Sequence, residues 1–167
     1  MVESDGDSHP LEEEIGEALL AGSLVLAVAE SCTGGMVSAR ITGVAGSSRY
    51  FRGGVVAYSN EVKRGILSVS GETLERFGAV SAETAIEMAQ GVRERLGAHL
   101  GLSVTGIAGP SGGTGGKPVG TVFIAVCDTR TVSSCKSHFD GNRESVRRKS
   151  AGKALELLQE FLQSRDG

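Results

Sequence analysis

The stretch between residues 24 and 41 constrains the fold of this chain more than any other. An apolar run, residues 24–29, leads into a turn of small polar residues and glycines, residues 30–35, and then into a helix-like stretch, residues 36–41. This strand–turn–helix order is typical of open α/β sheets, where ligands bind at the carboxyl edge of the strands. Helix starts also offer unpaired backbone N–H groups to anions. A helix cap with glycines for close packing would explain the same residues.

Hydrophobic periodicity extends this pattern along the whole chain. Helical spacing is expected over residues 11–21, 36–43, 59–63, 71–77, 81–96 and 142–163, and strands over 24–29, 50–58, 100–104, 119–127 and 131–139. The first three strands are joined through helices, so we expect them to be parallel, whereas three residues join the last two as an antiparallel hairpin. The sequence therefore predicts a three-layer α/β/α sandwich around one mixed, mostly parallel five-stranded sheet.

Length and charge give the expected domain organisation. The chain of 167 residues fits one domain, and its first 17 residues carry seven acidic residues and no Lys or Arg. We predict a disordered acidic tail over residues 1–10 and a single domain over residues 11–165. Seventeen bases and thirteen acids remain after residue 17, a modest excess that suits a small anionic ligand.

Composition also disfavours several classes of protein. Aromatic residues make up 4% of the chain and Trp is absent, so a nucleic-acid stacking surface is poorly supplied. No apolar run has the length of a membrane span, and the acidic N-terminus is unlike a signal peptide. Three scattered cysteines without a CxxC pair argue against disulfides and zinc. We expect a cytoplasmic protein without nucleic-acid or membrane partners.

Three strand ends carry groups that can do chemistry. Ser31, Tyr58 and Thr105 each follow a predicted parallel strand, and Lys63 lies about one turn beyond Tyr58. Because the carboxyl ends of parallel strands meet at one edge of the sheet, we expect these side chains to surround one crevice. The glycine-rich loop over residues 106–118 opens on the same edge.

A serine needs a base to become a nucleophile. The three histidines lie in the tail, before a strand and on the hairpin, so Lys63 is the better candidate, since burial would lower its pKa. Backbone amides from Cys32 to Gly34 could then bind an oxyanion, which indicates acyl transfer chemistry. Lys63 could equally be a solvated surface lysine. Cys32 is the competing nucleophile, because a helix start lowers thiol pKa values, unless it only fills the core.

The glycine loop resembles a phosphate-binding loop only loosely. Residues 111–118 fail the Walker A pattern at both ends, because Ser111 replaces the first Gly and Pro118 the final Ser or Thr. A looser backbone cradle for a ligand and a flexible surface loop both remain open. Three arginines at the start of the last helix could contact an anion or form a solvated face: Arg143, Arg147 and Arg148.

Several ordered motifs resemble the CinA C-terminal domain family of nicotinamide-nucleotide amidases. They are Ala29-Glu30-Ser31-Cys32-Thr33-Gly34-Gly35, Gly53-Gly54-Val55-Val56-Ala57-Tyr58-Ser59-Asn60-Glu61-Val62-Lys63, Gly78-Ala79-Val80-Ser81, Thr105-Gly106-Ile107-Ala108-Gly109-Pro110, Lys117-Pro118-Val119-Gly120 and Phe139-Asp140-Gly141-Asn142-Arg143 with Val146-Arg147. Together they cover the chain from about Leu11 to Leu162, and the fold of that family agrees with the sandwich expected from periodicity.

The resemblance implies hydrolysis of nicotinamide mononucleotide to nicotinate mononucleotide and ammonia, without a metal or cofactor. It implies Ser31 as nucleophile and Lys63 as base, with Thr105 and Tyr58 in the same catalytic site. It also implies a homo-oligomer whose small-molecule partner is a pyridine mononucleotide. The substrate contacts that we predict are Glu30, Cys32, Thr33, Gly34, Gly106, Ala108, Gly109 and Arg143. A catalytically silent nucleotide-binding module and a Cys32 amidase are the alternatives.

Overall fold

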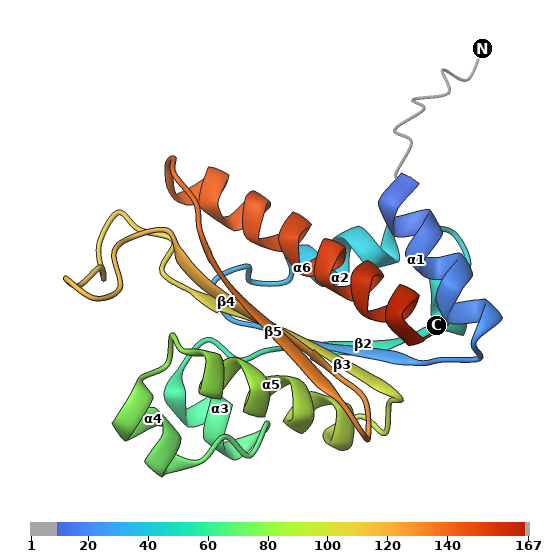
Figure 1. Cartoon of the computed structure of the whole chain (residues 1–167), viewed down its shortest axis with the longest axis horizontal. Coiled ribbons are helices and arrows are strands. Elements are labelled where there is room, and N and C mark those ends of the chain that lie inside the picture. Colours follow the sequence, from blue (N-terminus) through green and yellow to red (C-terminus); the bar gives the residue numbers. More distant parts are fainter. Residues whose placement is uncertain (1–9, 166–167) are drawn as a thin grey trace.

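Five strands form a single mixed sheet in the computed structural model, which describes residues 10–165 (Figure 1). The strands are β1 (Leu26–Glu30), β2 (Phe51–Val56), β3 (Leu100–Gly106), β4 (Thr121–Cys127) and β5 (Val132–His138). The helices are α1 (Pro10–Ala21), α2 (Met36–Thr42), α3 (Asn60–Gly65), α4 (Gly71–Phe77), α5 (Ala82–Arg95) and α6 (Arg143–Arg165), with a short 3₁₀ turn, η1 (Ser47–Arg49).

The strand order is β2-β1-β3-β4-β5, so β1 lies between β2 and β3. These three strands are parallel, and Glu30 at the end of β1 is in register with Val56 of β2 and Val104 of β3. β4 is antiparallel to β3, and β5 is antiparallel to β4. Every residue of β1 is buried, as expected for a strand covered on both faces. The carboxyl ends of β1, β2 and β3 therefore meet at one edge.

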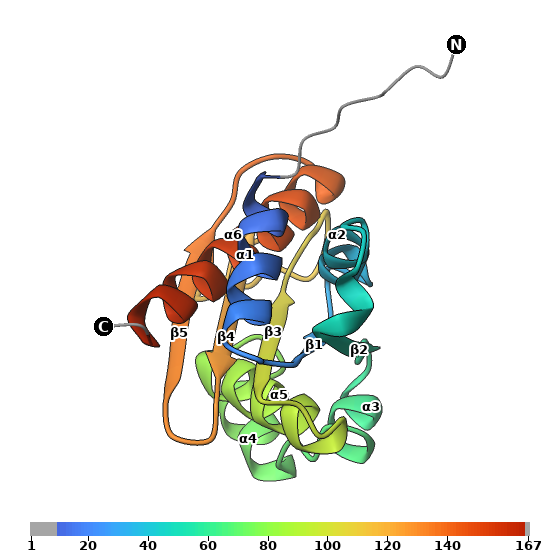
Figure 2. The same cartoon turned by 90° about the vertical axis from the view of Figure 1, so that its right-hand side faces the viewer.

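Helices cover both faces of the sheet, which confirms the predicted three-layer sandwich. α1, α2 and α6 lie on one face, and α3, α4 and α5 lie on the other (Figures 1 and 2). Leu26, Val28 and Leu102 point into the core beneath α6, whereas Ala27, Ala29 and Met88 belong to the opposite core. Both cores include residues of the same strands. The loops at the carboxyl edge of the sheet are therefore supported by helices on both faces.

Glycine allows the closest approach between a helix and the sheet. A Cβ on Gly101 of β3 would lie 2.0 Å from the backbone oxygen of Ala89 in α5. Only a residue without a side chain lets α5 pack this closely on β3. This packing fixes the position of the 78–81 turn, which precedes α5 and borders the candidate site.

The element boundaries confirm one prediction and correct another. The helix expected over residues 36–43 spans Met36–Thr42, and residues 31–35 form the turns before it. Glu30 belongs to β1, whereas we expected it in the turn. Residues 1–9 of the predicted tail lie outside the described residues, and Pro10 begins α1. Among residues 10–165, no helix combines the length and apolar character that crossing a membrane requires.

Candidate active site

Backbone bonds to both neighbouring strands hold Ser31 at the edge of the sheet. The Ser31 N–H donates to the Val104 carbonyl of β3 at 2.9 Å, and the Ala57 N–H donates to the Glu30 carbonyl at 2.8 Å. Ser31 is buried, with 7% of its surface exposed. The hydroxyl therefore stands directly beyond β1, between the loops that follow β2 and β3.

Lys63 reaches the same point from α3. The Ser59 side chain caps this helix by accepting from the Val62 N–H, which directs the first turn of α3 toward the sheet edge. Only 1% of the Lys63 surface is exposed. Its Nζ lies 3.1 Å from Ser31 Oγ and donates to the carbonyls of Ala57 and Tyr58 at 2.8 and 3.3 Å. The two side chains predicted as nucleophile and base are thus in hydrogen-bond contact.

Burial lowers the pKa of the Lys63 amine below its usual value of 10.5, and the Cys32 thiol opposes this shift. Burial acts in this direction because the charged ammonium loses its hydration. A neutral amine has two N–H groups and one lone pair. In its neutral form Lys63 would give both N–H groups to the Ala57 and Tyr58 carbonyls and keep the lone pair for the Ser31 hydroxyl. This arrangement can accept the serine proton.

Cys32 has the opposite character to a reactive thiol. Burial raises its pKa to about 11, although its own backbone and Arg147 pull the pKa down. We expected the start of the following helix to lower this pKa. Instead, the first free amides of α2 are occupied by Glu30, so they are unavailable to the thiol. Cys32 is therefore protonated near neutral pH, which disfavours it as the nucleophile.

Thr105 and Tyr58 occupy different depths of the same cavity. Thr105 is buried and its Oγ1 donates to the Ala79 carbonyl at 2.7 Å. Tyr58 is 61% exposed, and its hydroxyl accepts from Arg143 at 3.0 Å. A second guanidinium nitrogen of Arg143 donates to the Gly109 carbonyl at 2.7 Å. Arg143 therefore joins the loop after β2 to the glycine loop.

The cavity has a volume of about 330 Å³ and contains all four predicted catalytic residues. Its lining residues are Ser31, Cys32, Tyr58, Lys63, Ala79, Val80, Thr105, Gly106, Ile107, Ala108, Gly109, Ser111, Gly112 and Arg143. Two basic side chains and no acidic ones are among them, so the lining favours an anionic ligand. Sequence reasoning missed Ala79 and Val80 as lining residues. A contact between segments 26 residues apart, from Thr105 to the Ala79 carbonyl, brings them to the cavity.

The predicted substrate residues Glu30, Thr33 and Gly34 are not among the lining residues. Both Glu30 carboxylate oxygens accept from residues of its own loop and of α2, so the carboxylate faces away from a ligand. The Thr33 carbonyl accepts from Arg147, and the Gly34 N–H donates to the Ser31 carbonyl. The structure thus places these three residues in the support of the loop rather than on the cavity wall.

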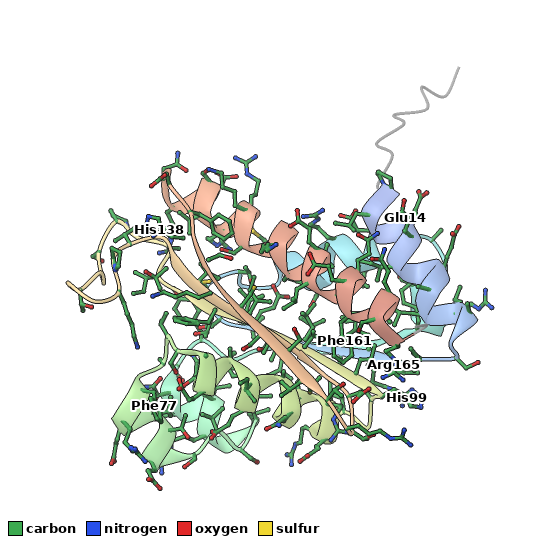
Figure 3. The ribbon with its side chains drawn as sticks, viewed as in Figure 1. Glu14, Phe77, His99, His138, Phe161 and Arg165 are labelled. Carbon is green, nitrogen blue, oxygen red and sulfur yellow. The ribbon has the colours of Figure 1, made fainter. Side chains whose placement is uncertain are left out.

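The arginines and histidines considered in the sequence analysis differ in their distance from the cavity. Of the three arginines that we considered for anion binding, Arg143 lines the cavity, Arg147 binds loop carbonyls, and Arg148 is exposed beside Glu144. Figure 3 shows His99 and His138 at opposite ends of the sheet, and neither lines the cavity. Lys63 is therefore the basic side chain closest to Ser31 among those that line the cavity.

Comparisons with known proteins bear on the family of this chain. The family model described as the CinA C-terminal domain matches residues 8–162. A CinA-like protein of Syntrophomonas wolfei is 49% identical over 158 residues, which are 95% of this chain and 38% of that protein. A CinA-like protein of Geobacter sp. (strain M21) is also 49% identical, over 159 residues, with the same shares. The chain thus spans 38% of the length of these curated relatives.

Solved structures show the same fold over nearly the whole chain. A CinA superfamily protein from Klebsiella pneumoniae has a TM-score of 0.89 at 35% identity, covering 92% of this chain and 96% of that chain. A competence/damage inducible protein from Agrobacterium tumefaciens has a TM-score of 0.87 at 40% identity, with 92% and 93% covered. With the family model matched across the described domain, the chain belongs to the CinA C-terminal domain family.

Proposed function

We propose that this chain hydrolyses the carboxamide of nicotinamide mononucleotide to nicotinate mononucleotide and ammonia, with Ser31 as nucleophile and Lys63 as base. The observation that carries the proposal is a desolvated amine 3.1 Å from a serine hydroxyl in a polar cavity. The substrate rests on the family resemblance of the motifs. The basic, acid-free lining of the cavity suits the phosphate of this ligand.

The reaction follows from the contacts of Lys63. Its lone pair takes the proton of Ser31 Oγ as this oxygen bonds to the carboxamide carbon. The resulting ammonium gives that proton to the amide nitrogen, the C–N bond breaks, and ammonia leaves. Water then attacks the acyl-serine ester with Lys63 again accepting a proton, which returns to Ser31 Oγ as the carboxylate product forms.

The developing oxyanion needs donors near Ser31. The Cys32 N–H follows the nucleophile directly, and within residues 10–165 no carbonyl oxygen accepts a hydrogen bond from it. Cys32 also lines the cavity, so its amide is our candidate for the oxyanion hole. Arg143 and Tyr58, at the mouth of the cavity, would contact the ribose phosphate.

The test measures ammonia release and nicotinate mononucleotide formation by the purified chain. Ser31→Ala is expected to abolish turnover, because no other group in the proposal can carry the acyl intermediate. Lys63→Ala should lower kcat by about 10²–10⁴-fold, and its effect should not add to that of Ser31→Ala. Cys32→Ala is the matched control beside the nucleophile and should keep most of the activity.

Two outcomes would favour the alternatives. Calorimetric binding of nicotinamide mononucleotide without ammonia release would indicate a silent binding module. Loss of turnover in Cys32→Ala with retention in Ser31→Ala would make the thiol the nucleophile. Normal rates in Lys63→Ala would remove the proposed base.

A further inference from the structure

Residues 31–35, hereafter the nucleophile loop, are anchored from outside the cavity by two oppositely charged side chains. The first anchor is Glu30, which is 1% exposed. One of its oxygens accepts from Thr33 Oγ1 at 2.7 Å and from the Val37 N–H at 2.9 Å. The other accepts from the N–H and hydroxyl of Ser38 at 3.1 and 2.8 Å.

Glu30 thereby replaces the missing cap of α2. The N-cap residue of this helix is Gly35, which has no side chain to accept from the first amides. The Glu30 carboxylate comes from the strand end and takes the amides of Val37 and Ser38 instead. Because the same carboxylate binds Thr33, the end of β1, the nucleophile loop and the start of α2 are held as one unit.

The second anchor is Arg147 in the second turn of α6. Its Nε donates to the Cys32 carbonyl at 2.9 Å, and its Nη2 donates to the Thr33 carbonyl at 3.2 Å. Gly34 leaves room for this guanidinium, since a Cβ there would lie 3.1 Å from Nη2. The planar guanidinium is suited to binding two successive carbonyls, which a lysine could not do with the same geometry.

These contacts also set the direction of the candidate oxyanion donor. In a trans peptide the C=O and the N–H point in opposite directions. The Gly34 N–H holds the Ser31 carbonyl at 3.1 Å and so fixes the Cys32 N–H of the same peptide. Arg147 holds the carbonyl of Cys32, the next group along the backbone. The loop that contains the donor is itself held by Glu30 and Arg147.

We propose that Arg147 and Glu30 are positioning residues, which hold the nucleophile loop so that Ser31 and the Cys32 amide keep their reactive arrangement. This inference rests on the proposed function. It assigns to Glu30 an indirect role in place of the substrate contact predicted from the sequence. Neither residue touches the substrate, so their loss should act on kcat far more than on KM.

Arg147→Ala and Arg148→Ala form a matched pair for the test. Arg148 is the next residue of the same helix, is exposed, and forms a 3.8 Å surface pair with Glu144. We expect Arg147→Ala to lower kcat by about 10²-fold, the loss typical of one oxyanion donor, with KM within a few-fold. Arg148→Ala should match the wild type. Added guanidinium chloride, below denaturing concentrations, should restore part of the kcat of Arg147→Ala, whereas a merely structural defect would not respond.

Two further, more conservative variants keep the test informative if Arg147→Ala does not fold. Arg147→Lys keeps the charge but can serve only one carbonyl well, so its kcat should lie between those of the wild type and Arg147→Ala. Glu30→Gln keeps the shape but places an amide donor against the α2 amides, and should also lower kcat at little change in KM. Circular dichroism checks that each variant is folded.

Alkylation of Cys32 by iodoacetamide gives a second readout that needs no activity. Cys32 belongs to the loop and is 6% exposed, so loosening the loop in Arg147→Ala should speed modification of its thiol, measured by peptide mass spectrometry. Cys135 on β5 is the internal reference and should react at an unchanged rate. Unchanged kcat and unchanged Cys32 alkylation in Arg147→Ala would overturn the inference. If the wild type releases no ammonia, the proposed function fails, and alkylation alone decides whether Arg147 holds the loop.

Discussion

At the scale of single residues, Lys63 is the most unusual side chain of the molecule. A lysine is almost never fully buried unless it is paired, and the partners of this one are a hydroxyl and two carbonyls. No carboxylate accepts from its Nζ among the described residues. Its lowered pKa is therefore a direct result of desolvation, and it makes the stability of the fold depend on pH.

Lys63→Met tests this dependence. Between the lowered pKa of Lys63 and its usual value of 10.5, the unfolded chain binds more protons than the folded chain. The free energy of unfolding of the wild type, relative to Lys63→Met, should therefore rise as pH increases through this window, and stay flat below it. Urea titrations of both proteins at a series of pH values measure the difference. A difference that falls with pH would mean that Lys63 is charged in the folded state throughout.

At the scale of elements, the sequence predicted the strand–turn–helix units and the start of α2, but not the group that caps this helix. Residues 31–35 look like helix caps, so the sequence could not reveal that the cap of α2 is a carboxylate from the preceding strand. The Glu30 carboxylate accepts from the amides of Val37 and Ser38, so these amides cannot bind an anion beside Cys32 as we expected. Ser59 and Ser81, in contrast, cap α3 and α5 through bonds that span only three residues, which a local sequence pattern can reveal.

Gly101→Ala tests the contact between β3 and α5. The new Cβ would meet the Ala89 backbone oxygen at 2.0 Å, so α5 must move, and we expect a loss of about 1–3 kcal/mol of stability. Gly65→Ala at the end of α3 is the control, because nothing lies within 4 Å of its added Cβ. It should be neutral or gain up to about 1 kcal/mol. Thermal unfolding of both variants makes the comparison, and equal melting temperatures would contradict the close packing of α5.

At the scale of the whole molecule, one sheet contributes residues to the hydrophobic cores on both of its faces. Helices lie on both faces of the sheet (Figure 2). The strands that bury Leu102 against α6 also bury Ala27 and Ala29 in the core of the other face. Lys63 on one face and Arg147 on the other converge on the nucleophile loop, which neither layer could hold alone. The sequence predicted the layers and the meeting of Ser31 with Lys63, since both follow from strand polarity. It left the contacts of Arg147 and Glu30 open, because these depend on packing between distant segments.

A shared sheet predicts that both layers unfold together. Leu102→Ala, under α6, and Met88→Ala, in α5, should each lower stability by about 2–5 kcal/mol. Each variant should still show a single calorimetric transition whose van't Hoff and calorimetric enthalpies agree. Two separate transitions in either variant would show that the layers are independent.

The glycine loop has a consequence for how new specificities can arise. Its ends are fixed by the pairing of Gly106 with Val122 and by the bonds of Ile107 with Thr121 and Gly120. We therefore expect that another loop can replace it without disturbing the strand that leads to Ser31 or the helix that carries Lys63. If the proposed function holds, chimeras with grafted loops should still hydrolyse carboxamides while accepting different ones, because Ser31 and Lys63 lie outside the loop.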